Sequence, residues 1–160
     1  MKSTNWKDIA ELIGIAAIVL SLILVAYEMR QNTQMMRAQT RDSLTEKQMM
    51  FSGWIGANRF AADVVLRGSR GELEPGTPEF LAYGFLTHGI LREWENSFYQ
   101  YQQGLFDESE FEPRRYRWRT NMKLAGYRAY WEIGRDAFSP SFRAEIDSII
   151  DEIETETDTE

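Results

Sequence analysis

Residues 9–27 read IAELIGIAAIVLSLILVAY, and from Leu12 to Tyr27 this stretch carries no charged side chain. A helix that crosses a bilayer needs about 20 mostly apolar residues. Residues 9–27 supply nineteen, with Glu11 as the only charge, close to one end. Trp6 and Tyr27 flank the stretch, and such aromatic residues favour the membrane interface. The sequence therefore predicts a single transmembrane helix over residues 9–27, preceded by an N-terminal tail at residues 1–8.

Two other kinds of segment share this composition, namely the buried core helix of a soluble protein and a cleaved signal peptide. A signal peptide opens on a basic segment, whereas two acids, Asp8 and Glu11, lie at the start of this apolar run. Residues 24–26, Leu-Val-Ala, also make a poor small-x-small cleavage site. The sequence thus favours a retained span over both alternatives.

Small residues recur along the apolar run at intervals of four, three and four, which places them on one helix face. In lipid, such a face lets two helix backbones approach closely. We expect it to pack against a second copy of the chain or another membrane protein, although alanine is common enough in such helices to produce the pattern by chance. The predicted helix-packing face consists of Ala10, Gly14, Ala17 and Ser21.

Basic residues near the predicted span indicate its orientation. Lys2 and Lys7 precede it, whereas Arg30, Arg37 and Arg41 follow it. Because Lys and Arg are enriched on the cytoplasmic side, we expect a single-pass protein of the cytoplasmic (inner) membrane with its following domain in the cytoplasm. Membrane lipid is then a predicted partner, with headgroup contacts from Trp6, Lys7, Arg30, Arg37 and Arg41.

The composition of the 160-residue chain excludes several function classes. It has no cysteine, so disulfides and thiolate catalysis are absent. The net charge is −7, and eight of the 25 acids lie within residues 145–160, which contain no Lys or Arg. The remaining 17 acids face 18 bases, so the body of the chain is nearly neutral. This balance argues against a nucleic-acid partner.

The rest of the chain reads as all-α, because apolar residues recur at helical rather than alternating spacing. We expect a stalk helix at 28–56 that continues the span, a small helical-bundle domain at 57–153 and a disordered acidic tail at 154–160. The best-defined helix runs from Pro78 to about Gln103, with Thr77 as its N-cap. Its apolar stripe comprises Phe80, Tyr83, Thr87, Leu91, Trp94, Phe98 and Tyr101.

Turn and cap residues predict where the later helices begin and end. Gly104 is placed to end the helix before it in a left-handed cap. Phe106 and Phe111 around Asp107 fit a hydrophobic staple at the start of the next helix. Pro113 offers a second possible start, since proline is favoured in a first helical turn. That helix should run to about residue 125, followed by an aromatic segment at 126–134 and a final helix opened by Ser139-Pro140.

The segment Tyr27-Glu28-Met29-Arg30-Gln31-Asn32-Thr33, directly after the apolar run, resembles the opening of a large family of small bacterial membrane-associated proteins. Further matching features are Glu95-Asn96 before aromatic residues, Gly104-Leu105-Phe106-Asp107, Trp131 and the Phe-Ser-Pro-x-Phe segment at 138–142. The resemblance spans about residues 11–150. It implies an N-terminal span and an all-helical domain, and it carries no known activity and no functional residues.

Candidate buried polar residues lie on the helix expected at 78–103, and they are His88, Glu95, Asn96 and Tyr99. The chain has one histidine and no Glu-x-x-His repeat, so metal ligands are not predicted. His88 and Glu95 lie about 10.5 Å apart along a helix axis and should not touch. Because a buried carboxylate needs a partner, we expect Glu95 to pair with Arg115 or Arg119.

The segment Pro113-Arg114-Arg115-Tyr116-Arg117-Trp118-Arg119 is the densest basic stretch. Arginines interleaved with aromatic residues can bind nucleic acid or anionic lipid headgroups. An amphipathic helix with Tyr116 and Trp118 partly buried gives the same string, and the acidic final helix offers an internal partner. A solvated or internally paired face is therefore favoured.

Two functional hypotheses remain. The first is a membrane-anchored binding or assembly module, either a scaffold or an accessory subunit of a membrane complex. Its expected partner is a second copy of the chain, in a homo-oligomer, or another membrane protein. The second is a membrane-bound ligand sensor or enzyme that uses a polar site around Glu95 and His88. The sequence contains no catalytic constellation and no pattern that indicates a cofactor, so it favours the first.

Overall fold

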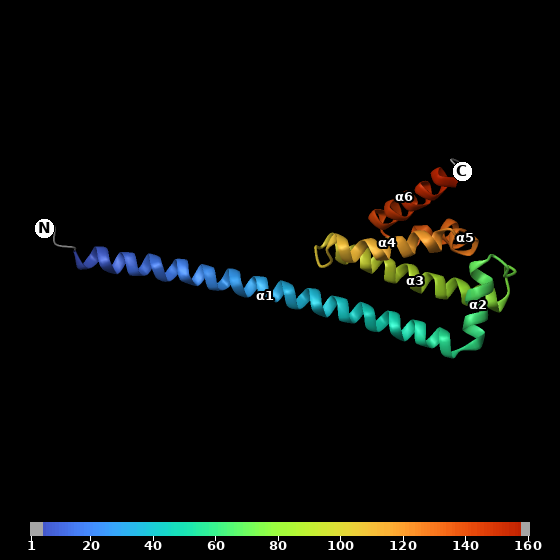
Figure 1. Cartoon of the computed structure of the whole chain (residues 1–160), viewed down its shortest axis with the longest axis horizontal. Coiled ribbons are helices and arrows are strands. Elements are labelled where there is room, and N and C mark those ends of the chain that lie inside the picture. Colours follow the sequence, from blue (N-terminus) through green and yellow to red (C-terminus); the bar gives the residue numbers. More distant parts are fainter. Residues whose placement is uncertain (1–4, 158–160) are drawn as a thin grey trace. The chain divides into compact units, whose positions relative to one another are not determined.

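A computed structural model describes residues 5–157, and every regular element in that range is a helix (Figure 1). The predicted all-α class is therefore confirmed. Contacts divide the chain into two compact units, Met1–Gln39 and Thr40–Glu160. The elements in chain order are α1 (Trp6–Ala57), α2 (Arg59–Ser69), α3 (Pro78–Gln102), α4 (Glu108–Met122), α5 (Ala125–Gly134), the 3₁₀ turn η1 (Arg135–Ala137) and α6 (Pro140–Thr157).

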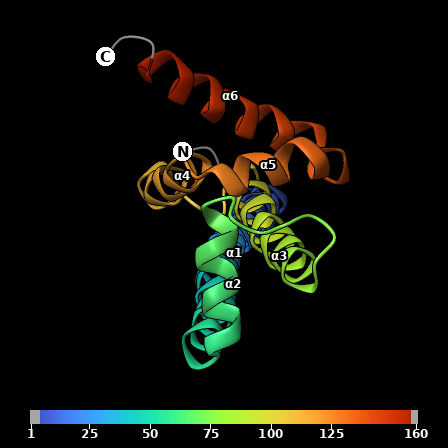
Figure 2. The same cartoon turned by 90° about the vertical axis from the view of Figure 1, so that its right-hand side faces the viewer.

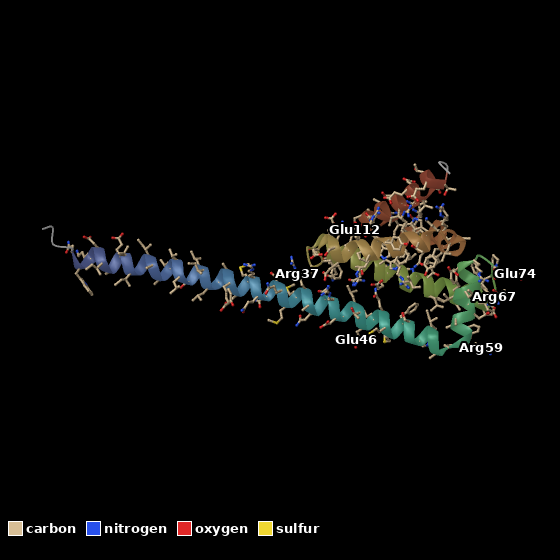
Figure 3. All side chains as sticks on the ribbon, in the orientation of Figure 1. Arg37, Glu46, Arg59, Arg67, Glu74 and Glu112 are labelled. Atoms are coloured by element: carbon tan, nitrogen blue, oxygen red, sulfur yellow. The ribbon has the colours of Figure 1, made fainter. Side chains whose placement is uncertain are left out.

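Helix α1 is continuous through the predicted span and the predicted stalk. It contains a window long and apolar enough to cross a membrane, and no residue of that window is buried in the described part of the chain. Figure 3 shows side chains projecting from both edges of the ribbon of this helix. The helix passes through Gly53 and Gly56 and ends at Ala57.

The last turns of α1, from Thr40 onwards, pack within the second unit. Leu44 is almost fully buried, and the Gln48 side-chain amide donates to Glu93 on α3 at 3.0 Å. Arg41, which we expected at lipid headgroups, forms an ion pair with Glu110 on α4. Its partner is thus an acidic side chain of the same unit.

Side-chain caps define the starts of three helices, as expected for orphan N–H groups at helix N-termini. The Asn58 side chain accepts from the backbone N–H of Ala61, at the start of α2. Thr77 accepts from the N–H of Phe80, which confirms the predicted cap of α3. Asp107 accepts from the N–H of Glu110 at the start of α4.

The turn after α3 and the course of α4 test three predictions. Gly104 has a φ of 69°, which confirms the left-handed cap. Phe106 and Phe111 are both buried around Asp107, in agreement with the predicted staple. Pro113 lies inside α4 rather than in its first turn. The helix ends at Met122, earlier than predicted, because the backbone of Leu124 is extended (φ −83°, ψ 132°) and α5 starts after it at Ala125.

Helix α6 begins at Pro140, as predicted, and continues to Thr157. The expected disordered tail is therefore wrong for residues 154–157, where Glu154 pairs with Arg128 and Glu156 pairs with Arg119. Residues 158–160 lie outside the described part of the chain.

The main core lies where α3, α4, α5 and α6 meet (Figure 2). Trp94 on α3 stacks on Trp118 of α4 and on Tyr127 of α5, with ring centroids 5.6 and 5.8 Å apart. Phe142 and Ile146 of α6 are fully buried against the same cluster. A smaller cluster between α2, the following loop and α3 contains Val64, Leu73 and Tyr83.

Candidate binding pocket

A pocket of about 640 Å³ opens beside the smaller cluster. The loop after α2 forms one wall with Leu73 and Pro75, α3 forms a second, and α5 forms a third. Most of its lining is apolar. The side chains that line it from the two helices are Phe80, Leu81, Tyr83, Phe85 and His88 on α3 and Ala129, Tyr130 and Ile133 on α5.

Two glycines determine how closely the helices at this pocket approach. A Cβ on Gly68 of α2 would lie 2.2 Å from the Tyr83 ring, and a Cβ on Gly126 of α5 would lie 1.9 Å from the Gly68 carbonyl oxygen. No side chain larger than hydrogen fits either position without a shift of backbone or of a packed ring. The three helices therefore meet at a contact that only glycine allows, and the pocket lies beside this contact.

Polar groups are few at the pocket and lie together on α3 and α5. His88 Nδ1 and the Tyr130 hydroxyl are 2.8 Å apart and share a hydrogen bond. The Tyr83 hydroxyl lies 2.7 Å from where a Gly126 Cβ would be, at the pocket wall. Within the described residues, neither the Tyr83 hydroxyl nor the buried Thr87 hydroxyl has a hydrogen-bond partner of good geometry.

The electrostatic environment of these groups is that of an apolar site. Burial raises the pKa of Tyr83, an effect that the nearby Thr87 hydroxyl only partly offsets. Burial also raises the pKa of Tyr130, opposed by the positive charge of Arg92. Both phenols are thus neutral hydrogen-bonding groups at physiological pH.

The rim of the pocket is strongly apolar. Leu81, Phe85 and Ile133 all line it, and 61%, 71% and 77% of their surfaces are exposed. Single exposed apolar residues are ordinary on protein surfaces, whereas a group of them around a concavity marks an interaction site. The pocket and its rim therefore form a candidate interaction site in the second unit.

The predicted polar site is divided between two places. His88 lines the pocket, while one Glu95 oxygen accepts from the backbone N–H of Ser139 at 2.7 Å and the other accepts from Arg92 at 2.6 Å. Burial alone would raise the pKa of Glu95, but these two donors lower it overall. Asn96 is half-buried, and Tyr99 is exposed. The expectation of a buried Tyr99 is wrong, because it points off the stripe that faces the core.

The predicted partners of Glu95 are also wrong, since Arg115 and Arg119 serve the final helix. Arg115 donates to Glu145 at 2.7 Å and to both oxygens of Glu152 at 2.6 and 3.2 Å. The hydrogen bond with Glu152 is the main cause that raises the pKa of Arg115. Arg119 pairs with Glu156. Two of the four arginines of the basic stretch are thus paired with α6, and Arg114 pairs with Glu93 on α3, in line with the internally paired face that the sequence favoured.

The aromatic residues of that stretch differ from each other. Trp118 is buried in the main core, whereas 71% of the Tyr116 surface is exposed. The prediction that both are partly buried therefore fails for Tyr116. Two residues apart on a helix, the two side chains point about 200° from each other, and only one can face the core.

Sequence reasoning missed the pocket, because its determinants are long-range. Tyr130 is 42 positions from His88, and Gly126 is 58 positions from Gly68. The only local signal was the position of Gly126 and Gly134 around an aromatic segment. Over the residues that the structure describes, no group of three or more His, Cys, Asp or Glu could hold a metal ion.

No protein-family model, curated protein or solved structure matches this chain.

Proposed function

We propose that the chain is a single-pass membrane protein whose helical unit, Thr40–Glu160, serves as a binding or assembly module at the membrane surface. One observation carries the proposal. The apolar window of α1 has no buried residue, so no part of the described chain covers it. Side chains such as Leu20, Leu22 and Ile23 are each about 60% exposed. Exposure of that much apolar surface to water is unfavourable by about 25 cal/mol per Å², and a bilayer removes the penalty.

Retention in the membrane is testable with a pair of charge substitutions. We expect the full chain to stay with the membrane through alkaline carbonate extraction. Leu20→Arg with Ile23→Arg should release it, because each arginine at mid-span costs about 2.5–3.5 kcal/mol. Met49→Arg with Met50→Arg is the matched control, since both methionines are 71% exposed on α1 outside the apolar window.

Two results would contradict the anchor. One is a wild-type chain that carbonate extracts completely. The other is a mature protein whose mass shows removal of the apolar stretch, because that is the behaviour of a signal sequence.

The proposed partner is a second copy or another membrane protein packed on the small-residue face. A Cβ on Gly14 would meet nothing within 4 Å, so Gly14→Leu leaves the chain's own fold unchanged and changes only what packs against the helix. Ala16→Leu is the matched control, because Ala16 lies two residues, or about 200°, around the helix from Gly14.

Crosslinking in native membranes measures this packing. We expect an adduct of the wild type and of Ala16→Leu that Gly14→Leu reduces several-fold. A wild type that gives only monomer, or an adduct that both variants retain equally, would contradict the packing face.

The proposed orientation places the helical unit in the cytoplasm, at the inner membrane. Arg30 and Arg37 follow the apolar window on α1 and are exposed, as juxtamembrane basic residues at anionic headgroups would be. Trp6 and Lys7 lie at the opposite end of the window and are also exposed.

A second candidate function is ligand binding by the helical unit. The pocket favours it, because His88 and Tyr130 place a hydrogen-bonded polar pair in an otherwise apolar wall. Glu95 is not part of this candidate, since its oxygens are occupied by Ser139 and Arg92.

A further inference from the structure

We infer that the pocket between α3, α5 and the loop after α2 binds a single-chain amphiphile, with its alkyl chain on the apolar walls and an oxygen headgroup at His88 and Tyr130. The inference deepens the proposed function and rests on it in one respect, since a membrane anchor keeps the helical unit beside a source of such molecules. The chemistry shared by the candidate ligands is an alkyl chain with a hydroxyl or carboxylate head.

The size and lining of the pocket suit an alkyl chain. A volume of about 640 Å³ lies within the range of about 300–1,000 Å³ that is typical of small-molecule sites. The walls are the side chains of Phe80, Leu81, Phe85 and Ile133, together with glycine and alanine backbone from α3 and α5. Such a surface offers dispersion contacts to an alkyl chain and few hydrogen bonds to water.

A small group of polar side chains in the pocket wall suits an oxygen headgroup. His88 and Tyr130 are bonded to each other, and an imidazole or a phenol can either donate or accept a second hydrogen bond. Tyr83 is buried and also lines the pocket, and its hydroxyl lies beside Gly126 with the Thr87 hydroxyl as a polar neighbour. Few polar groups in an otherwise apolar concavity orient a ligand that has one polar end.

A ligand of this kind accounts for more of the site than a docked helix would. A partner helix could cover the exposed rim at Phe85 and Ile133. Its backbone would leave the remaining hydrogen-bonding capacity of His88 and Tyr130 unused, because a helix has no spare backbone donors or acceptors along its sides. A single oxygen headgroup on a thin chain can enter the wall where these groups lie.

The test uses the full chain in phosphatidylcholine nanodiscs and a 16-carbon fatty acid that carries a diazirine near the end of its chain. After photolysis, mass spectrometry of peptides locates the adducts. We expect adducts on α3 and α5 and, separately, on the apolar window of α1, where the probe dissolved in the bilayer reacts.

Gly84→Leu blocks the pocket and Gly89→Leu is its matched control. Both glycines lie on α3, and only Gly84 lines the pocket, where its added Cβ would lie 3.9 Å from the Tyr130 ring. A Cβ on Gly89 meets nothing within 4 Å. We expect Gly84→Leu to reduce adducts on α3 and α5 at least fivefold with those on α1 unchanged, and Gly89→Leu to reduce neither. Unchanged melting of both variants shows that the fold is kept.

Unlabelled competitors show whether the pocket recognises a polar headgroup or only an alkyl chain. We expect palmitic acid or hexadecanol to prevent labelling of α3 and α5 at concentrations at least tenfold below those needed for hexadecane. The stronger of the two identifies the headgroup as carboxylate or hydroxyl. Tyr130→Phe should remove most of this preference over hexadecane, because it deletes one of the two bonded polar groups.

The possible failures are distinguishable. Adducts confined to α1 overturn the ligand site and leave the anchor in place, whereas adducts on α3 and α5 without any on α1 contradict the anchor alone. Equal competition by hexadecane, or equal labelling of α3 and α5 in Gly84→Leu, overturns the ligand site.

Discussion

Replacement of Gly126 by alanine tests the close packing of α2, α3 and α5. The added Cβ would lie 1.9 Å from the Gly68 carbonyl oxygen and 2.7 Å from the Tyr83 hydroxyl. The first of these neighbours is backbone, and the second belongs to a ring that itself lies against Gly68. Neither can move away alone, so α5 has to shift from α2 to admit one methyl group.

The size of the effect follows from two opposing terms. Overpacking of this kind costs about 1–3 kcal/mol and occasionally more, and a clash with backbone belongs at the upper end. Alanine gains about 1 kcal/mol over glycine in a helix, less at a position in the first turn. The net loss of unfolding free energy is then about 2 kcal/mol, or roughly 6–10 °C in Tm for a unit of this size.

The assay is thermal unfolding of the full chain in detergent micelles, followed by tryptophan fluorescence. Trp94, Trp118 and Trp131 are all buried in the second unit, so their emission reports its melting. Gly89→Ala is the control, because its Cβ meets open space and it should gain up to about 1 kcal/mol. If Gly126→Ala melts with the wild type or above it, the reasoning from close packing is refuted.

Two further predictions concern ion pairs. Arg115→Gln breaks the bidentate hydrogen bond to Glu152 of α6. It should lower the free energy of unfolding by about 1–2 kcal/mol, a value between those of exposed and buried ion pairs. Denaturant titration measures this loss, with Arg117→Gln as the control at an exposed arginine. Glu95 has a pKa below its ordinary value, because the donors Ser139 and Arg92 outweigh burial. Its stabilising effect is therefore present above the unfolded pKa of about 4.3 and is lost as the pH falls through the lower folded value. Tm should fall less steeply below pH 5 in Glu95→Gln than in the wild type.

Two results would contradict these predictions about Arg115 and Glu95. Equal stability of the Arg115 and Arg117 variants would show that the pairs with α6 contribute nothing net. An acid dependence of Tm that Glu95→Gln leaves unchanged would assign the loss of stability to other carboxylates, such as Glu152, whose hydrogen bond from Arg115 also lowers its pKa.

The sequence predicted what depends on neighbours within a few turns. Helical periodicity gave the all-α class, and local cap chemistry at Thr77 and Gly104 gave the bounds of α3 within one residue. The apolar run likewise predicted a continuous helix through residues 9–27. Each of these features is determined by side chains close in sequence, so one amino-acid sequence is enough to predict them.

The predictions from sequence failed where a contact with a residue far away in the sequence determines the structure. Glu95 has Ser139, 44 positions away, as a partner, and nothing near Glu95 in sequence indicates it. The pocket depends on Gly68 and Gly126 coming into contact, which composition cannot reveal. Helix α6 continues past residue 153 although its end is acidic, because Arg119 and Arg128 of other helices pair with Glu156 and Glu154.

The proposed membrane protein requires the apolar window of α1 to lie in a bilayer. Because the chain has no cysteine, single cysteines at Asp8, Leu20 and Ser52 can be labelled with a membrane-impermeant maleimide in intact bacterial cells. We predict labelling of Asp8→Cys from outside, of Ser52→Cys only after lysis, and of Leu20→Cys only in detergent. Labelling of Leu20→Cys as fast as the other two in lysed cells without detergent would contradict the membrane span.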